Sequence, residues 1–210
     1  MLLSYKKLVI GLAVLLAAMP TAAQSRSIYG AGVDEDSVLV RLVNAGATNP
    51  TEVRIGALKL SVPALGATPY RPTLADIFII SYAGKRYEFI PEAGSYYTLI
   101  ESGDKLVILN DVKHTNRARA QIYFYNMTGG TPAELKTSDG KTSLVGPCAA
   151  GSSAQIAVNP VSLTLAVYQD GEKSSTDMPV KLERGASFSV FAYSGPAGAA
   201  AFVVKAAVAK

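Results

Sequence analysis

Few side chains in this sequence could act as acids, bases or nucleophiles. His114 is the single histidine and Cys148 the single cysteine. A Ser–His–Asp hydrolase would need His114 as its base, and a Cys–His enzyme would need both residues. Neither Gly-x-Ser-x-Gly nor Gly-Asp-Ser occurs, and Ser102-Gly103-Asp104 is typical of a turn. We therefore predict no catalytic residue, and we expect His114 in solvent between the basic residues Lys113 and Arg117.

Metal and cofactor sites are not indicated either. One histidine and one cysteine cannot make a structural zinc site without carboxylates, and Cys148 is expected to be a small buried hydrophobic residue. Asp34-Glu35-Asp36 lacks the spaced oxygen ligands of a calcium loop. The sequence has no glycine-rich phosphate loop. We predict no metal and no cofactor, while a pair of carboxylates distant in the chain, as in glycosidases, stays open.

The aromatic residues are more informative, with 11 tyrosines and no tryptophan. Tyr123 and Tyr125 share one face of their segment if it is a strand, because side chains alternate along a strand. Arg41 holds the same face in a related segment. This face is either a binding surface or the wider half of a core, and both alternatives stay open. The candidate binding surface comprises Arg41, Lys113, His114, Arg117, Tyr123 and Tyr125.

Two segments of the chain repeat one pattern. Val40–Asn44 and Ile122–Asn126 are mostly apolar runs that end in asparagine. A proline, a glutamate, an aliphatic residue and a base follow at the same distances in both. These residues are Pro50, Glu52, Val53 and Arg54 in the first copy, and Pro132, Glu134, Leu135 and Lys136 in the second. The ungapped match favours a duplicated domain. Asn126 also fits a glycosylation acceptor, but a structural role at a strand end explains both asparagines.

Both halves have the pattern of short strands. Aliphatic or β-branched runs alternate with Gly, Asp and Ser turns at spacings of roughly ten residues, which is typical of a sandwich. Prolines interrupt the windows in which a helix could form. We also expect a strand in the alanine-rich C-terminal stretch, by analogy with the first half. The expected strands include Ser37–Asn44, Ile77–Tyr82, Tyr87–Ile90, Tyr96–Ile100, Leu106–Leu109, Leu163–Tyr168, Ser187–Tyr193 and Ala201–Val208.

These patterns predict an all-β fold. It consists of two tandem β-sandwich domains, immunoglobulin-like or jelly-roll-like, that are related by internal duplication. We place the domains at residues 26–111 and 118–210, with a polar linker at 112–117. Small open sandwiches expose strand edges, which favours β-augmentation by a partner or packing of one domain on the other.

Residues 1–25 resemble a secretory signal peptide. Lys6 and Lys7 precede the apolar run Leu8–Met19, and Thr21-Ala22-Ala23 supplies small residues for cleavage near Ala23. The run is too short to span a bilayer, so we expect an exported, soluble mature chain. Loss of both lysines lowers the formal charge from +4 to +2, which disfavours nucleic acid as a partner.

Several motifs carry a family resemblance. Val40–Ala45, Pro50, Gly84 and Ala93–Tyr96 are similar to the pattern of exported bacterial sandwich domains. The whole chain resembles the AlgF family of alginate biosynthesis proteins. It shares the leader, Ile28-Tyr29-Gly30 soon after it, and a second domain of similar size.

The resemblance implies a non-catalytic periplasmic protein that is required for O-acetylation of an exopolysaccharide, alginate or an alginate-like polymer. Its implied partners are a membrane-bound O-acyltransferase and periplasmic enzymes with a Ser–His–Asp site, which it would hold together as an adaptor. The polymer itself is a further candidate partner. Two alternatives stay open: a polysaccharide-binding sandwich module, and an esterase or acetyltransferase that uses His114.

Overall fold

The structure is a computed structural model that describes residues 37–46, 49–196 and 198–209. Over these residues, all the regular secondary structure consists of strands. The strands up to residue 111 are β1 (Val38–Asn44), β2 (Thr51–Ile55), β3 (Leu58–Val62), β4 (Gly66–Ala67), β5 (Arg71–Thr73), β6 (Phe78–Tyr82), β7 (Lys85–Phe89), β8 (Tyr96–Ser102) and β9 (Lys105–Asp111). The later strands are β10 (Ala120–Met127), β11 (Ala133–Thr137), β12 (Ser143–Cys148), β13 (Ser152–Val158), β14 (Ser162–Gln169), β15 (Glu172–Lys173), β16 (Met178–Lys181), β17 (Ser187–Gly195) and β18 (Gly198–Ala206).

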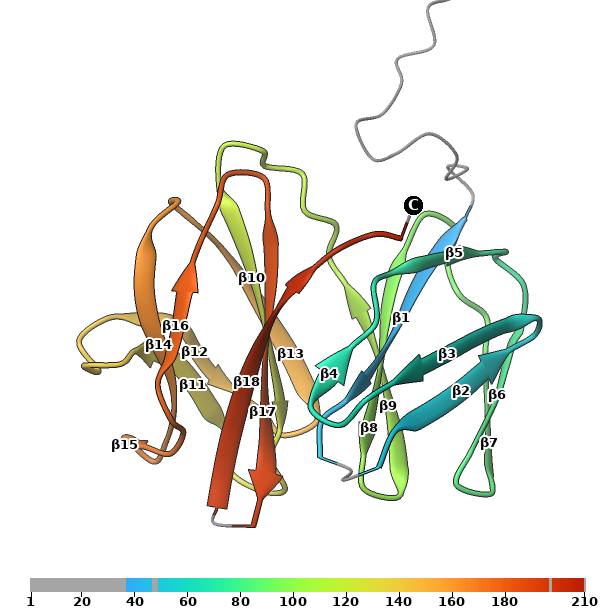
Figure 1. Ribbon diagram of the computed structural model, residues 1–210, viewed down its shortest axis with the longest axis horizontal. Helices are drawn as coiled ribbons and strands as arrows, with labels where there is room; N and C mark the ends of the chain where they lie inside the picture. The colour runs from blue at the N-terminus through green and yellow to red at the C-terminus, as the bar shows by residue number, and fades with distance from the viewer. Residues whose placement is uncertain (1–36, 47–48, 197, 210) are drawn as a thin grey trace, which may run out of the picture. The chain divides into compact units, whose positions relative to one another are not determined.

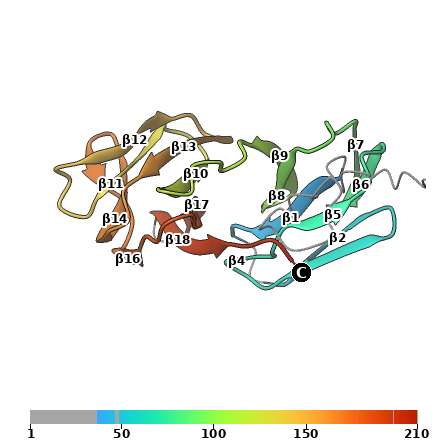
Figure 2. The ribbon, with the colours of Figure 1, turned by 90° about the horizontal axis from the view of Figure 1, so that it is seen from above.

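Strands β1 to β9 form the first sandwich. Its inner sheet has the order β4-β1-β8-β9, with β5 also paired to β1, and its outer sheet has the order β3-β2-β6-β7. Figure 2 shows β8 and β9 on one side of this sandwich and β6 and β7 on the other. The core between the sheets contains Val40, Leu42 and Leu99 from the inner sheet, and Val53 and Ile80 from the outer one. Burying one face of each sheet in this way is what holds a sandwich together.

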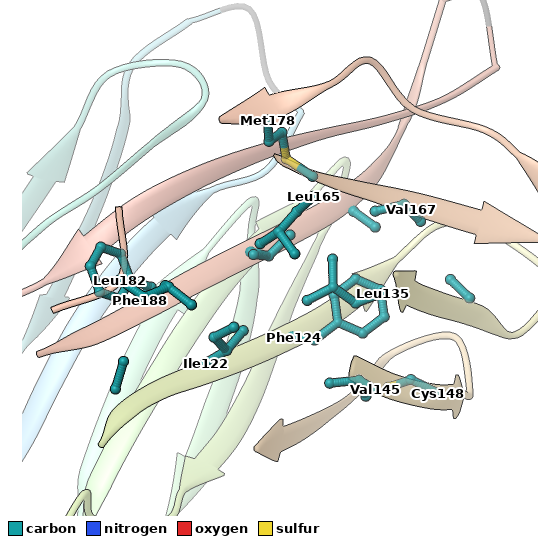
Figure 3. Close-up of a cluster of buried hydrophobic side chains, with 14 residues drawn as sticks. Ile122, Phe124, Leu135, Val145, Cys148, Leu165, Val167, Met178, Leu182 and Phe188 are labelled. Atoms are coloured by element: carbon teal, nitrogen blue, oxygen red, sulfur yellow. The ribbon is translucent and has the colours of Figure 1, made fainter. Parts of the chain in front are cut away.

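Strands β10 to β18 form the second sandwich (Figure 1). Its inner sheet has the order β13-β10-β17-β18, and its outer sheet has the order β12-β11-β14-β15 with β16 also paired to β14. In the close-up of the core, Phe124 and Phe188 from the inner sheet lie with Leu135, Leu165 and other apolar side chains of the outer sheet (Figure 3). Cys148 is buried in this core as the small hydrophobic residue that we expected.

Both sandwiches have the same topology, which confirms the predicted duplication. The first strand of each inner sheet runs parallel to the penultimate strand, as β1 does to β8 and β10 to β17. The backbone contacts at the start of these pairs also match. The amide of Leu39 donates to the carbonyl of Ser95 at 2.9 Å, and the amide of Gln121 donates to that of Ala186 at 2.9 Å.

The twin asparagines have the structural role that the sequence indicated. Asn44 Nδ2 donates to the carbonyl of Asn49 at 2.9 Å, and Asn126 Nδ2 donates to that of Thr131 at 3.2 Å. In each case the side-chain oxygen accepts from the backbone amide two residues later. Asn126 is fully buried. Each asparagine therefore closes the loop that follows the first strand of its sandwich.

The predicted strands and turns are confirmed, with ends that shift by a few residues. The alanine-rich stretch forms β18, and the turn between β6 and β7 has φ of 49° at Ala83 and 72° at Gly84, as a tight hairpin requires. The leader at 1–25 lies outside the described residues. The domain bounds at 26–111 and 118–210 stay a prediction. Strand β9 ends at Asp111 and β10 begins at Ala120, on either side of the proposed linker.

Candidate functional site at the junction of the sandwiches

The outer faces of the two inner sheets are buried against each other. Every residue of β1 and of β10 is buried, although each strand has only one face in its own sandwich core. The described residues belong to one compact unit. A third apolar cluster joins Val43 and Ile100 of the first sandwich to Tyr123, Tyr125 and Phe191 of the second. We call this contact region the junction.

A network of buried polar side chains crosses the junction, and we call it the Arg41 cluster. Arg41 is 1% exposed and lies in the middle of β1. Its Nε donates to Thr98 Oγ1 of the same sandwich at 2.8 Å. Its Nη2 donates to Tyr125 Oη at 2.7 Å and to Ser189 Oγ at 2.9 Å, both in the second sandwich. One guanidinium therefore links strands from both sandwiches.

Asp111, the last residue of β9, is the anionic member of the cluster. Its Oδ1 accepts from Tyr125 Oη at 2.6 Å, and its Oδ2 accepts from Tyr70 Oη at 2.7 Å and from the hydroxyl of Thr98. The Tyr125 hydroxyl thus accepts from Arg41 and donates to Asp111. A buried charge is stabilised when its hydrogen-bonding capacity is filled, and this carboxylate receives three donors.

Aromatic rings surround the guanidinium. Its Cζ lies 4.5 Å from the ring centroid of Tyr70, 5.5 Å from that of Tyr125 and 5.6 Å from that of Phe191. The rings of Tyr125 and Phe191 stack at 4.6 Å. Burial by itself lowers the pKa of Arg41, but the surrounding Tyr125, Tyr70 and Asp111 groups outweigh it and hold that pKa above its usual value. Arg41 is therefore a permanent cation inside the protein.

Burial also raises the pKa values of the junction tyrosines. The pKa of Tyr70 lies well above 10.0, mainly because the phenolate would be desolvated. The pKa values of Tyr123 and Tyr125 are raised for the same first reason, with the charge of Asp111 adding to the effect. These hydroxyls therefore stay neutral donors over the physiological pH range.

The end of the chain makes a further contact across the junction. After β18, Val208 forms a parallel bridge with Tyr70, which lies between β4 and β5. In Figure 1 the segment after β18 runs from the second sandwich toward the first. The amide of Tyr70 donates to the carbonyl of Ala207, and the amide of Ala209 donates to the carbonyl of Tyr70, both at 2.8 Å. The backbone of Tyr70 thus joins the two sandwiches, while its side chain contacts Thr98, Asp111 and Arg41 of the first sandwich.

The structure brings together only part of the candidate binding surface. Arg41, Tyr123 and Tyr125 are buried at the junction, so the structure selects the core alternative for this face over the exposed one. Lys113 and Arg117 are exposed in the segment between β9 and β10. A binding role for these two residues stays a prediction.

His114 is partly buried instead of standing free in solvent. Its Nε2 lies 2.7 Å from the carbonyl of Asn116, and its Nδ1 lies 3.2 Å from Ser187 Oγ. Because a carbonyl only accepts, Nε2 carries the proton in this contact and Nδ1 can accept from Ser187. A Ser–His–Asp hydrolase would place a carboxylate on the second nitrogen, and here a backbone carbonyl holds that position.

Four members of the Arg41 cluster escaped the sequence reasoning. They are Tyr70, Thr98, Asp111 and Ser189. One signal was present, since a lone arginine inside an otherwise apolar run needs a buried anion or many acceptors. Asp111, two residues after the predicted strand Leu106–Leu109, was a candidate for that anion, but no local pattern connects it with Arg41.

Other kinds of site are not seen in the described ranges. Within residues 37–46, 49–196 and 198–209, no three His, Cys, Asp or Glu side chains are grouped so that they could hold a metal ion. Over the same residues, no helix has the length and apolar character to cross a membrane.

Comparisons with known proteins now bear on the chain as a whole. The model of the family described as "Alginate O-acetyl transferase AlgF" matches residues 10–189. The chain belongs to the AlgF family. The sequence resemblance is thereby confirmed over residues 10–189, which include most of both sandwiches.

Individual members of the family agree with this assignment. The chain is 29% identical over 183 residues to the alginate biosynthesis protein AlgF of Pseudomonas putida, with 86% of this chain and 84% of that protein covered. It is 28% identical over 184 residues to the protein of the same name from Pseudomonas aeruginosa, with 87% and 84% covered. A solved structure of the C-terminal domain of AlgF from P. aeruginosa matches at 30% identity and a TM-score of 0.38, with 42% of this chain and 98% of that chain covered.

Proposed function

We propose that the protein is a non-catalytic periplasmic adaptor in the O-acetylation of an exopolysaccharide, alginate or an alginate-like polymer. The family description and the names of its relatives support the link to alginate and O-acetyl transfer. The observation that carries the adaptor role is the junction. Arg41 is the one buried arginine among the residues that the structure describes, and it and its hydrogen-bond partners join the two sandwiches.

A rigid pair of sandwiches suits an adaptor. The Arg41 cluster, the apolar cluster and the C-terminal bridge all resist separation of the two bodies. Binding one partner on each sandwich then keeps the two partners at a fixed spacing, and this raises the effective concentration of one enzyme near the other. Each outer sheet keeps a face that is not used in a sandwich core.

Polysaccharide binding has less support from the surface. Sugar-binding sandwiches offer exposed aromatic rings for stacking, and we expected an aromatic row if this alternative held. Every aromatic residue that the structure describes is buried or partly buried. Affinity of the chain for an anionic polymer would still favour this alternative.

An esterase or acetyltransferase is the other rival, and the Ser187–His114 contact is the observation that favours it. The substitution His114→Ala separates the two functions. If the protein is an adaptor, the His114→Ala chain should restore polymer acetylation in a deletion strain. If it is an enzyme with a Ser187–His114 pair, the same variant should lose hydrolysis of a chromogenic acetyl ester.

The adaptor function is tested by affinity capture of the O-acyltransferase and the periplasmic acetylation enzymes on the tagged chain, together with acetyl content of the polymer. We expect capture by the wild-type chain and loss of acetylation in the deletion strain. Intact acetylation without the chain, together with no capture, would refute the adaptor.

A further inference from the structure

The outward face of the first outer sheet carries an exposed apolar patch, which we call the isoleucine patch. Ile79 of β6 is 45% exposed, Ile77 just before β6 is 48% exposed, and Ile90 just after β7 is 77% exposed. Leu74, three residues before Ile77, is 80% exposed. Strand register puts the isoleucines together: Phe78 pairs with Phe89 and points to the core, so Ile77 and Ile90 oppose each other on the outer side.

The second sandwich serves as an internal control for this patch. In both outer sheets the same strand pairs occur, with Ile55 opposite Ile80 in the first and Thr137 opposite Leu165 in the second. Phe78 likewise corresponds to Leu163, because these residues pair with Phe89 and Val180. The counterparts of Ile77, Ile79 and Ile90 are therefore Ser162, Thr164 and Lys181.

The fold itself does not require the patch, because the duplicated sandwich has only polar side chains at all three positions. Exposed apolar side chains that are clustered rather than scattered mark contact surfaces. The asymmetry between the two copies therefore points to a binding role that only the first outer sheet has.

Acidic side chains border the patch. Asp76 precedes Ile77 in the chain, Glu88 lies opposite Ile79 in the sheet, and Glu92 follows Ile90 by two residues. Glu88 is paired with Arg86 at 3.0 Å. Asp76 and Glu92 form no ion pair within the part of the chain that the structure describes. On the β2 side, Arg54 and Lys59 both pair with Glu52. Four carboxylates therefore stand against three cations around the patch, which leaves a net negative charge.

This charge selects among the possible occupants. An anionic bilayer would be repelled by the carboxylates. A second copy that docked patch to patch about a two-fold axis would bring two acidic borders together. A folded protein whose apolar contact residues are flanked by lysine or arginine complements both features.

We infer that the isoleucine patch is the docking surface for a protein partner that presents apolar side chains with a basic border. The inference deepens the proposed function and rests on it, because an adaptor needs a surface that binds a partner. It assigns one partner to the outer sheet of the first sandwich. Strand β7 is also an edge of that sheet, so the partner can approach the patch from the open side.

Photocrosslinking in the exporting host tests this directly. A benzoylphenylalanine is placed at Ile79 of the full chain, and in a matched control at Thr164, its counterpart in the second sandwich. We expect a protein adduct from Ile79 and none from Thr164. The substitutions Ile77→Ser and Ile90→Lys introduce the residues found at the equivalent positions of the second sandwich. Added to the chain that carries benzoylphenylalanine at position 79, they should lower the adduct yield by about tenfold or more, as for loss of a binding hot spot.

Folding of these variants is checked by thermal unfolding, and Ile90→Lys alone, at the most exposed isoleucine, provides a milder variant with the same expected direction. No adduct at Ile79, equal adducts at Ile79 and Thr164, an adduct of two copies of this chain, or a lipid adduct alone overturns the inference. A protein adduct that persists undiminished in the substituted chain also overturns it.

The two proposals fail differently. If the acetylation enzymes are captured equally by the wild-type chain and by the Ile77→Ser/Ile79→Thr/Ile90→Lys chain, the adaptor function holds and the patch inference falls. If Ile79 crosslinks a basic protein outside the acetylation apparatus, and the acetylation enzymes are not captured, the patch inference holds and the adaptor function falls.

Discussion

Replacing Arg41 with methionine should uncouple the two sandwiches. Methionine keeps much of the apolar stem but removes the guanidinium, and with it the donors to Thr98, Tyr125 and Ser189. Asp111 stays buried, and the cation that balances it is gone. Removing one member of a buried charged network costs about 3–5 kcal/mol, because the remaining charge stays desolvated.

The magnitude follows from the position of these bonds. Two of the three Arg41 hydrogen bonds end on the second sandwich, so most of the lost free energy belongs to the junction and not to either core. A domain of this size is stabilised by only about 5–15 kcal/mol. A loss of about 3–5 kcal/mol at the junction is therefore enough to let the sandwiches unfold in separate steps.

Urea unfolding, followed by tyrosine fluorescence and circular dichroism, measures this. We expect one cooperative transition for the wild-type chain and two for Arg41→Met. Arg54→Met is the matched control, since Arg54 is an exposed arginine on the same sandwich with only a surface ion pair to Glu52, and it should change the unfolding free energy by less than about 0.5 kcal/mol. In the double variant Arg41→Met/Asp111→Asn the buried charge is gone, so its destabilisation should be smaller than the sum of the two single ones.

The reasoning is refuted if Arg41→Met unfolds in a single transition within about 1 kcal/mol of the wild type. It is also refuted if the two substitutions are additive, because independent effects would mean that Arg41 and Asp111 do not share one network.

Three further predictions concern the junction tyrosines, a strand-end asparagine and a turn glycine. Burial raises the pKa values of Tyr70 and Tyr125 above 10.0, so above about pH 10 the unfolded chain loses protons that the folded chain keeps. The free energy of unfolding should therefore fall with rising pH by up to about 1.4 kcal/mol per pH unit for each tyrosine. Denaturation at stepped alkaline pH measures this, and a flat profile would contradict it. Asn126→Ala should cost about 1–3 kcal/mol because it removes the amide that donates to the carbonyls of Thr131 and Cys148, and an unchanged urea midpoint would argue against that role. Gly140→Ala should lower the melting temperature more than Gly84→Ala, although both glycines have positive φ. An added Cβ at Gly140 would lie 3.1 Å from the Tyr168 hydroxyl, whereas at Gly84 it would meet nothing within 4 Å. Equal losses in melting temperature would mean that the Tyr168 side chain moves away from the added Cβ at no cost.

Local patterns predicted most of the fold. The hairpin between β6 and β7 was visible because Ala83-Gly84 supports the positive φ of a tight turn. The duplication was visible because the asparagine near the end of β1, and the proline and glutamate that follow it, recur in identical order at the end of β10. Apart from Arg41 in β1 and Gln121 in β10, these two strands are apolar up to their strand-end asparagines. Apolar residues at successive positions agree with burial on both faces, whereas a strand with one buried face would alternate apolar and polar residues.

The candidate site could be predicted only in part. Arg41, Tyr123 and Tyr125 were singled out by residue type and by their shared face, but whether that face met solvent or protein could not be read from strand periodicity. Tyr125 is 84 positions from Arg41, and Ser189 is 148 positions away. The repeat relates equivalent positions of the two copies, but neither the repeat nor a turn signal indicates which distant side chains contact each other.

The sequence by itself therefore determined the strands, the turns and the duplicated plan, because backbone conformation and alternation depend on neighbouring residues. Only the tertiary structure decided that the equivalent faces of the two copies are packed together at the junction, and that the isoleucines at 77, 79 and 90 stay exposed. Burial of a second sheet face depends on which distant surface covers it, and this is a property of the folded chain and not of any segment within it.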